Sequence, residues 1–186
     1  MNTLMKKTLV ASAFGLLLSA NGAMAATSTA VAGGTISFTG SVTDTTCDVT
    51  TSGDKDFTVT LSPVALTDID AAGVATAGAK QFDMKVSGCE GYEAGQSLHI
   101  TFSGSNISDD EQYFKNDTGT ATGVGIAITT DGSTEVALNS SAETGLGADV
   151  TAGTISYFAN YYNFAGEGQA TAGTVVTSAT YTFDYQ

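Results

Sequence analysis

His99 is the only histidine in the chain and the side chain best suited to proton transfer near neutral pH. A serine, a histidine and an acid can together cleave an acyl bond when their side chains are hydrogen-bonded in that order. The sequence holds no G-x-S-x-G segment, the turn that exposes the nucleophile in one large class of hydrolases. His99 also occupies a polar position in an alternating segment, 98–102, which is typical of a solvated strand residue. No catalytic group can be named, and we predict that the chain is not an enzyme.

Two groups of acidic residues have the chemistry of a metal site. Asp68 with Asp70, and the run 109–111, offer carboxylate oxygens of the kind that calcium prefers. Neither group has the spacing of an EF-hand loop, and solvated loops explain both. A site built from softer ligands would need more than the two cysteines and one histidine present. We therefore predict neither a metal nor a cofactor.

Charge and composition exclude further classes of protein. The 186 residues include six lysines, no arginine and 19 carboxylates, a formal charge of −13. Binding to phosphate backbones needs clustered basic residues, so we predict no nucleic-acid partner. The chain has 22 glycines and is rich in threonine, a composition that favours an all-β protein with many turns. Its length suits one domain.

The N-terminus has the pattern of a cleaved signal peptide. Lys6 and Lys7 precede an apolar stretch, 8–18, which is too short for an ordinary membrane-spanning helix. Ala23-Met24-Ala25 is a small-x-small cleavage site, so we expect the mature chain to begin at Ala26. Removing residues 1–25 leaves 161 residues with four lysines against 19 carboxylates, a formal charge of −15. The alternative is an uncleaved membrane anchor. We predict an exported protein.

Export determines how the two cysteines are interpreted. Cys47 and Cys89 both lie in the mature chain, and two cysteines in an oxidising compartment usually pair. Their spacing excludes a CxxC redox pair. We predict a structural disulfide that closes a loop of 43 residues, counting both ends. The chain-entropy estimate for such a loop is about 4 kcal/mol of stabilisation.

Alternation of apolar and polar residues predicts strands through most of the mature chain. An Asp131-Gly132 turn between two alternating runs predicts a hairpin, with Val136 and Leu138 on the return strand. No stretch shows a helical period over ten residues, and strands with one apolar face imply two packed sheets. The segments 68–79 and 103–122 have the composition of loops. The predicted strands lie within 35–42, 57–61, 82–86, 98–102, 124–128, 155–161 and 175–185.

The two ends of the mature chain are unusual. Residues 26–34 carry no charge, and Val31 is their only apolar side chain of appreciable size. Tyr181, Phe183 and Tyr185 place three aromatic rings on one face of a last strand that ends at Gln186. A strand at the edge of a sheet is normally paired, covered or protected by charge. The first segment is therefore a candidate added strand, and the last strand is a candidate partner for one.

Four motifs in order resemble one protein family. Residues 34–42 read G-T-I-S-F-T-G-S-V and lead to Cys47, and residues 82–89 end at the second cysteine. Residues 123–128 read G-V-G-I-A-I. Last, Gly173 is the fourteenth residue from the C-terminus and Tyr185 the penultimate one. Together these motifs resemble the pilin subunits of chaperone–usher fimbriae, most closely the major subunits of type 1-like pili.

The resemblance implies an all-β fold, an incomplete immunoglobulin-like sandwich that lacks its last strand and is completed by donor-strand exchange. Residues 1–25 would be the signal peptide, 26–36 the donor extension and 37–186 the pilin domain. Within the extension, the residues implied to face the groove of a neighbour are Thr29, Val31 and Gly33. The residues implied to form the acceptor groove, filled first by a chaperone, are Gly173, Tyr181, Phe183 and Tyr185.

The function implied is that of a structural subunit, which polymerises into an extracellular fimbria at the cell surface and supports adhesion. Its implied partners are a periplasmic pilus chaperone, an outer-membrane usher, and identical or related pilin subunits. Two alternatives stay open: a minor or adaptor pilin of the same system, and a secreted, monomeric carbohydrate-binding sandwich. Within an aromatic cluster at 157–164, Tyr162 and Phe164 fall on the face opposite the core positions. They are candidates for contact between subunits, and the cluster is also a candidate carbohydrate platform.

Overall fold

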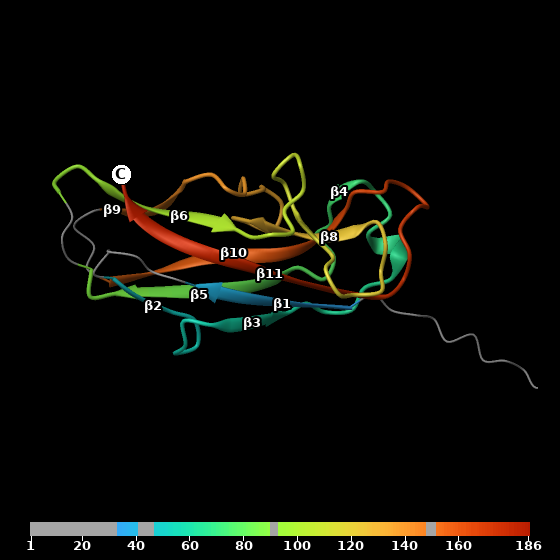
Figure 1. The fold of residues 1–186 in the computed structure, drawn as a ribbon, viewed down its shortest axis with the longest axis horizontal. Helices are drawn as coiled ribbons and strands as arrows, with labels where there is room; N and C mark the ends of the chain where they lie inside the picture. The colour runs from blue at the N-terminus through green and yellow to red at the C-terminus, as the bar shows by residue number, and fades with distance from the viewer. Residues whose placement is uncertain (1–32, 41–46, 90–92, 148–151) are drawn as a thin grey trace, which may run out of the picture.

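The computed structural model describes residues 33–40, 47–89, 93–147 and 152–186, the first of these ranges by its backbone (Figure 1). These ranges form strands and a single turn of 3-10 helix, η1, as predicted for an all-β chain. The elements are β1 (Gly33–Gly40), β2 (Asp48–Thr50), β3 (Phe57–Thr60), η1 (Leu66–Asp68), β4 (Gly73–Val74), β5 (Lys80–Ser87), β6 (Ser97–Ser103), β7 (Phe114–Lys115), β8 (Val124–Thr129), β9 (Ala142–Gly147), β10 (Ala152–Asn163) and β11 (Thr174–Tyr185).

The strands form two sheets that pack face to face. One sheet has the order β3-β1-β11-β6-β9, and the other has the order β2-β5-β10-β8-β7 with β4 added to β10. In Figure 1 the long strands β11 and β10 cross in the middle of the molecule, one in each layer. Within the described ranges, no helix is long and apolar enough to span a membrane.

Alternate residues of the strands fill the space between the sheets. Along β5 and β6, the apolar positions are buried and the polar positions between them are more exposed. The ring of Tyr157 on β10 packs edge-on against Phe102, with 5.2 Å between ring centroids, and lies 6.0 Å from Phe82. The period of two that predicted these strands therefore also identifies the core.

The hairpin predicted at Asp131-Gly132 forms only in part. The chain turns there, and the amide of Val136 donates to the carbonyl of Ile128 at 2.9 Å, but the return makes an isolated bridge and no strand. The segment then leaves β8, and the amide of Leu138 donates instead to the carbonyl of Glu111 at 2.9 Å. The prediction of a return strand was wrong, although Val136 and Leu138 are both buried.

Two asparagines on β10 hold the long loop before β5 against the sheet. The side-chain amide of Asn160 donates to the carbonyls of Ala75 and Gly132, both at 2.9 Å. The side-chain amide of Asn163 donates to the carbonyls of Ile69 and Asp70 at 3.0 and 2.8 Å. Both asparagines are fully buried, and these bonds pair their side-chain amides with carbonyls of the loop before β5 and, at Gly132, of the turn after β8.

Candidate functional site

The last strand, β11, is paired on both sides. On one side β6 runs antiparallel to it from Thr180 to Tyr185. On the other side β1 runs parallel to it, with Gly33 opposite Thr174 and Gly40 opposite Tyr181. β1 in turn pairs antiparallel with β3, so it fills the position between β3 and β11. We call this position the strand seat; Figure 1 shows β1 lying in it beside β11.

The aromatic residues of β11 face the core beside the strand seat. Tyr181 and Phe183 are almost fully buried, and their rings meet edge-on at 5.8 Å. The hydroxyl of Tyr181 donates to the carbonyl of Lys55 at 2.8 Å, which ties β11 to the turn between β2 and β3. Burial, with a smaller effect from the charge of Asp56, raises the pKa of Tyr181. Two of the predicted acceptor residues therefore line the core under the seat.

The predicted disulfide is present and lies at the end of β11. Cys47 and Cys89 are bonded, and both are buried. The hydroxyl of Tyr185 lies 3.3 Å from Sγ of Cys47, although 138 residues separate them in sequence. The disulfide therefore holds the start of β2 and the end of β5 next to the C-terminal end of β11.

The fourth predicted acceptor residue, Gly173, fixes the other end of β11. A Cβ added at Gly173 would collide with the backbone nitrogen of Ala121 and would lie 2.6 Å from Oγ1 of Thr120. The amide of Ala121 donates to the carbonyl of Thr174, and the amide of Thr174 donates to Oγ1 of Thr120, each at 3.0 Å. Only a residue without a side chain allows this close approach at the entry to β11.

The predicted donor residues fall at the edge of what the structure describes. Thr29 and Val31 lie outside the described residues, whereas Gly33 is the first residue of β1. The predicted boundary between donor extension and pilin domain, after residue 36, falls inside β1. β1 therefore contains the last four residues of the predicted donor extension, 33–36, and the first four residues of the predicted pilin domain, 37–40.

Chain length accounts for the direction of β1. Seven Cα steps join Gly40 to Cys47 and can span at most about 25 Å. In the parallel arrangement Gly40 lies opposite Tyr181, four residues from Tyr185 and its contact with Cys47. An antiparallel β1 would place Gly40 near Thr174, about 36 Å from Tyr185 along a strand. Within one chain, only the parallel direction lets the link reach the disulfide.

The two aromatic residues predicted to point away from the core behave differently. Tyr113 inserts between Tyr162 and Phe164, with ring centroids 4.5 and 5.0 Å away and nearly parallel planes. Tyr162 is 9% exposed, and its hydroxyl donates to Oε1 of Gln112 at 2.6 Å, whereas Phe164 is 45% exposed. Tyr162 is therefore part of an internal stack. The sequence did not predict this role, because the residue that stacks on Tyr162, Tyr113, lies in a predicted loop.

His99 is a surface residue of the sheet. Its ring nitrogens lie 3.0 Å from Oγ of Ser97 and 3.1 Å from Oγ of Ser141. Within the described residues, no three histidine, cysteine, aspartate or glutamate side chains are placed to hold a metal ion.

Comparisons with known proteins agree with this architecture. The fimbrial protein family matches residues 36–186. The major fimbrial subunit SMF-1 of Stenotrophomonas maltophilia (strain K279a) is 33% identical over 164 residues, which cover 83% of this chain and 93% of that protein. These two findings concern sequence and extend over most of the chain.

Solved structures share the fold. One is from a chaperone–usher pilus, in work on the molecular basis of rod uncoiling, with a TM-score of 0.58, 19% identity, and 80% of this chain and 93% of that one covered. The P pilus rod subunit PapA has a TM-score of 0.52 at 17% identity, covering 76% and 99%. With these immunoglobulin-like neighbours and the match over residues 36–186, the chain belongs to the fimbrial protein family, as a structural subunit rather than an enzyme.

Proposed function

We propose that this subunit polymerises by donating its N-terminal segment to the strand seat of a neighbouring subunit, and that the resulting surface fibre supports adhesion. On the way out of the cell the chain crosses the periplasm, where a pilus chaperone fills the seat first. An outer-membrane usher then brings a second subunit to the seat. The new strand replaces the chaperone, which is strand addition to an exposed edge.

One observation carries this proposal: the strand that fills the seat, β1, is joined to the strands that follow it only through residues 41–46. β1 is held by backbone pairing to β11 over eight residues and to β3 over four. Backbone pairing does not depend on which copy supplies the strand. The same segment of a neighbour can therefore occupy the seat. Its direction there is not restricted by the short link, which acts only within one chain.

Exchange between copies leads to an open fibre. The donated segment lies at the start of the chain, and the seat is formed by β3 and β11. A contact between two different surfaces does not close on itself, so each added subunit leaves one seat or one donor available. This geometry supports a linear polymer.

Two matched deletions test the proposal and locate the donor. One removes residues 26–32, which precede β1, and the other removes residues 33–40, which form it. Surface fractions are run on a denaturing gel without boiling, where strand-exchanged multimers are expected to remain as a ladder. We expect loss of the ladder when residues 33–40 are absent. A ladder that persists in both deletions, or wild-type protein that is monomeric throughout, would count against strand exchange.

A further inference from the structure

The first half of β11 has a strand on one side only. β1 pairs with residues 174–181 of β11, whereas β6 pairs with β11 only from Thr180 onward. Among the described strands, residues 174–179 therefore have no neighbour on the side away from the seat. If the strand in the seat leaves during exchange, this half of β11 would have no strand on either side. Its backbone groups would then need other hydrogen-bond partners to keep the strand in place.

A loop supplies these partners on the side away from the seat, and we call this loop, residues 116–121, the clamp. The amide of Asp117 donates to the carbonyl of Val176 at 2.8 Å. The amide of Ala121 donates to the carbonyl of Thr174 at 3.0 Å. Two backbone hydrogen bonds therefore join the clamp to β11 where β6 does not reach.

The side chain of Asn116 completes this pairing. Its Oδ1 accepts from the amide of Val176 at 2.8 Å, and its Nδ2 donates to the carbonyl of Thr174 at 3.1 Å. A residue of a parallel strand makes the same two bonds with its own peptide groups, one to each neighbour of the residue opposite it. The same side-chain amide accepts from the backbone of Gly119 at 3.0 Å and donates to the carbonyl of Ala121 at 2.8 Å, which fixes the clamp itself.

The clamp satisfies every backbone group of Thr174 and Val176. The remaining group, the amide of Thr174, donates to Oγ1 of Thr120 at 3.0 Å. Gly119 permits this close contact, as Gly173 does at the same end of β11, because a Cβ on Gly119 would collide with the carbonyl oxygen of Thr174. The pairing on this side of β11 therefore does not depend on what occupies the seat.

Side-chain burial holds the first half of β11 less firmly than the second half. The buried residues of the first half are Val175, Thr177 and Ala179, whereas those of the second half are Tyr181 and Phe183. Smaller side chains bury less apolar area and contribute less stability. Oγ1 of Thr177 is also buried without a hydrogen-bond partner among the described residues, which costs stability. The first half of β11 therefore depends more on its backbone partners.

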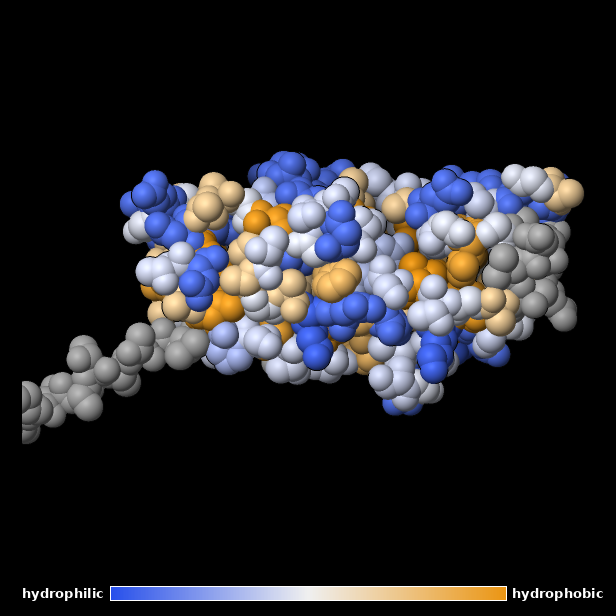
Figure 2. All heavy atoms as spheres, turned by 180° about the vertical axis from the view of Figure 1, so that it is seen from behind, coloured by the Kyte–Doolittle hydropathy of each residue, from blue (hydrophilic) through white to orange (hydrophobic). Residues whose placement is uncertain are grey.

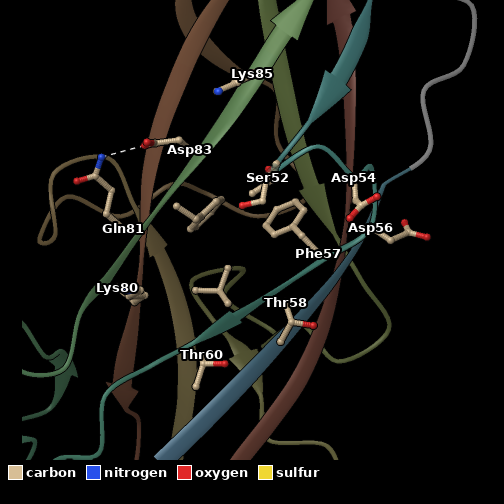
Figure 3. A pocket seen from close by; sticks show the side chains of 13 residues that line it. Ser52, Asp54, Asp56, Phe57, Thr58, Thr60, Lys80, Gln81, Asp83 and Lys85 are labelled. Carbon is tan, nitrogen blue, oxygen red and sulfur yellow. Dashed lines mark hydrogen bonds between the residues drawn. The ribbon is translucent and has the colours of Figure 1, made fainter.

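The other strand that borders the seat, β3, has no such support. It pairs with β1 over residues 57–60 and is the end strand of its sheet among the strands that the structure describes. Figure 3 shows Thr58 and Thr60 on β3 next to the blue ribbon of β1, and Phe57 pointing to the other side, into a pocket between β3 and β5. An empty seat would therefore leave β3 without a paired strand, while β11 would keep β6 and the clamp.

We propose that the clamp holds β11 in its strand conformation while the seat is empty, and that Asn116 is the positioning residue of this device. The proposal rests on the proposed function and deepens it, because it identifies the strand on which an incoming segment pairs first. Backbone groups of successive residues point to opposite edges of a strand, so those of Val175 and Thr177 face the seat. The clamp keeps them aligned for the incoming strand.

Hydrogen exchange in the wild-type mature chain tests the clamp without requiring a fibre. When β1 opens locally, the amides of Val175 and Thr177 lose their acceptors, whereas those of Thr174 and Val176 keep theirs in the clamp. After correction for intrinsic rates, NMR should show exchange about tenfold faster, or more, for the first pair. Equal exchange of all four amides would overturn the proposal, because both sides of β11 would then open together.

The closed subunit suits this measurement. The mature chain has a formal charge of −15, and on the face in Figure 2 hydrophobic residues appear in small areas separated by polar ones. Charge repulsion and the lack of a continuous apolar patch on that face favour a monomer in solution. The exchange rates therefore report on opening within one subunit.

An alanine variant separates the positioning role from stability. Asn116→Ala removes the side-chain amide from the clamp, and the matched control, Asn160→Ala, removes the same group from β10 in the other sheet. The ladder in surface fractions is measured relative to the subunit in the periplasm. We expect this ratio to fall about tenfold for Asn116→Ala, which loses two bonds to β11, and to stay near wild type for the control. Thr118→Ala, at an exposed position of the clamp, should change neither ratio nor stability.

The outcomes distinguish this proposal from the strand exchange on which it rests. An unchanged ratio for Asn116→Ala, or an equal fall in both asparagine variants at equal melting temperature, would overturn the role of the clamp. If Asn116→Ala does not fold, the wild-type amides alone decide. Absence of a ladder from wild-type protein would instead refute strand exchange, and hydrogen exchange would still show whether the clamp holds β11 when β1 opens.

Discussion

Substitution of Gly173 by alanine should destabilise the subunit strongly although it adds a single methyl group. The new Cβ would collide with the backbone nitrogen of Ala121, and a backbone atom cannot turn aside. Overpacking of this kind costs about 1–3 kcal/mol. Separating the two segments also lengthens the bond between the carbonyl of Thr174 and the amide of Ala121, now 3.0 Å, which is worth about 0.5–1.5 kcal/mol. We expect a total loss of about 2–4 kcal/mol.

Thermal unfolding of the mature chain measures this loss. For a chain of this size, each kcal/mol lowers Tm by about 2–4 °C, so Gly173→Ala should lower it by roughly 5–15 °C. Ala172→Ser, one residue earlier and half-exposed, is the control and should leave Tm nearly unchanged. A Tm of Gly173→Ala within about 1 °C of wild type would refute the reasoning, because the entry to β11 would then have room for a side chain.

Four further predictions concern the core and the C-terminal end of β11. Cys47→Ser should lower the free energy of unfolding by about 4 kcal/mol, the chain-entropy value for its loop, and a melting temperature equal to that of the oxidised wild type would contradict this. Burial raises the pKa of Tyr157 to about 12, so its neutral form is favoured in the folded state. Stability should therefore fall as pH rises from about 10 to 12, and Tyr157→Phe should flatten that fall in a base titration. Asn160→Ala leaves the carbonyls of Ala75 and Gly132 without their donor, which should cost about 2–4 kcal/mol in denaturant unfolding, whereas no loss would mean that the loop is held elsewhere. Tyr185→Ala should reduce the amount of subunit in the periplasm by weakening capture by a chaperone, and unchanged levels would contradict that role.

The sequence predicted the strands whose apolar residues alternate over five positions or more. β5, β6, β8, β10 and β11 all cover the segments expected for them. Alternation identifies these strands because one face of each must be buried between the sheets. β2, β4 and β7 were missed because two or three residues cannot display a period of two. β9 was missed because its residues alternate between half-exposed and exposed, without an apolar face.

The partners of the strands could not be predicted from the pattern. Alternation marks 35–42 as a strand but does not indicate that it lies parallel to β11, since that depends on the short link to Cys47. The stacking of Tyr162 could not be predicted from the pattern either. Its position on β10 predicts a ring on the outer face, where the loop residue Tyr113 stacks on it. Contacts between segments far apart in sequence leave no local signal.

Under the proposed strand exchange, the short link between β1 and Cys47 also determines when a subunit can accept the strand of a neighbour. Because β1 is tethered within about 25 Å of its own seat, the seat meets it at an effective concentration near the millimolar range. A neighbour's segment at micromolar concentration is then outcompeted by about a thousandfold. A subunit whose own β1 occupies its seat would therefore not polymerise spontaneously. The proposed assembly therefore depends on the order of events, because the segment that fills the seat before β1 does would decide whether the chain remains a monomer or joins a fibre.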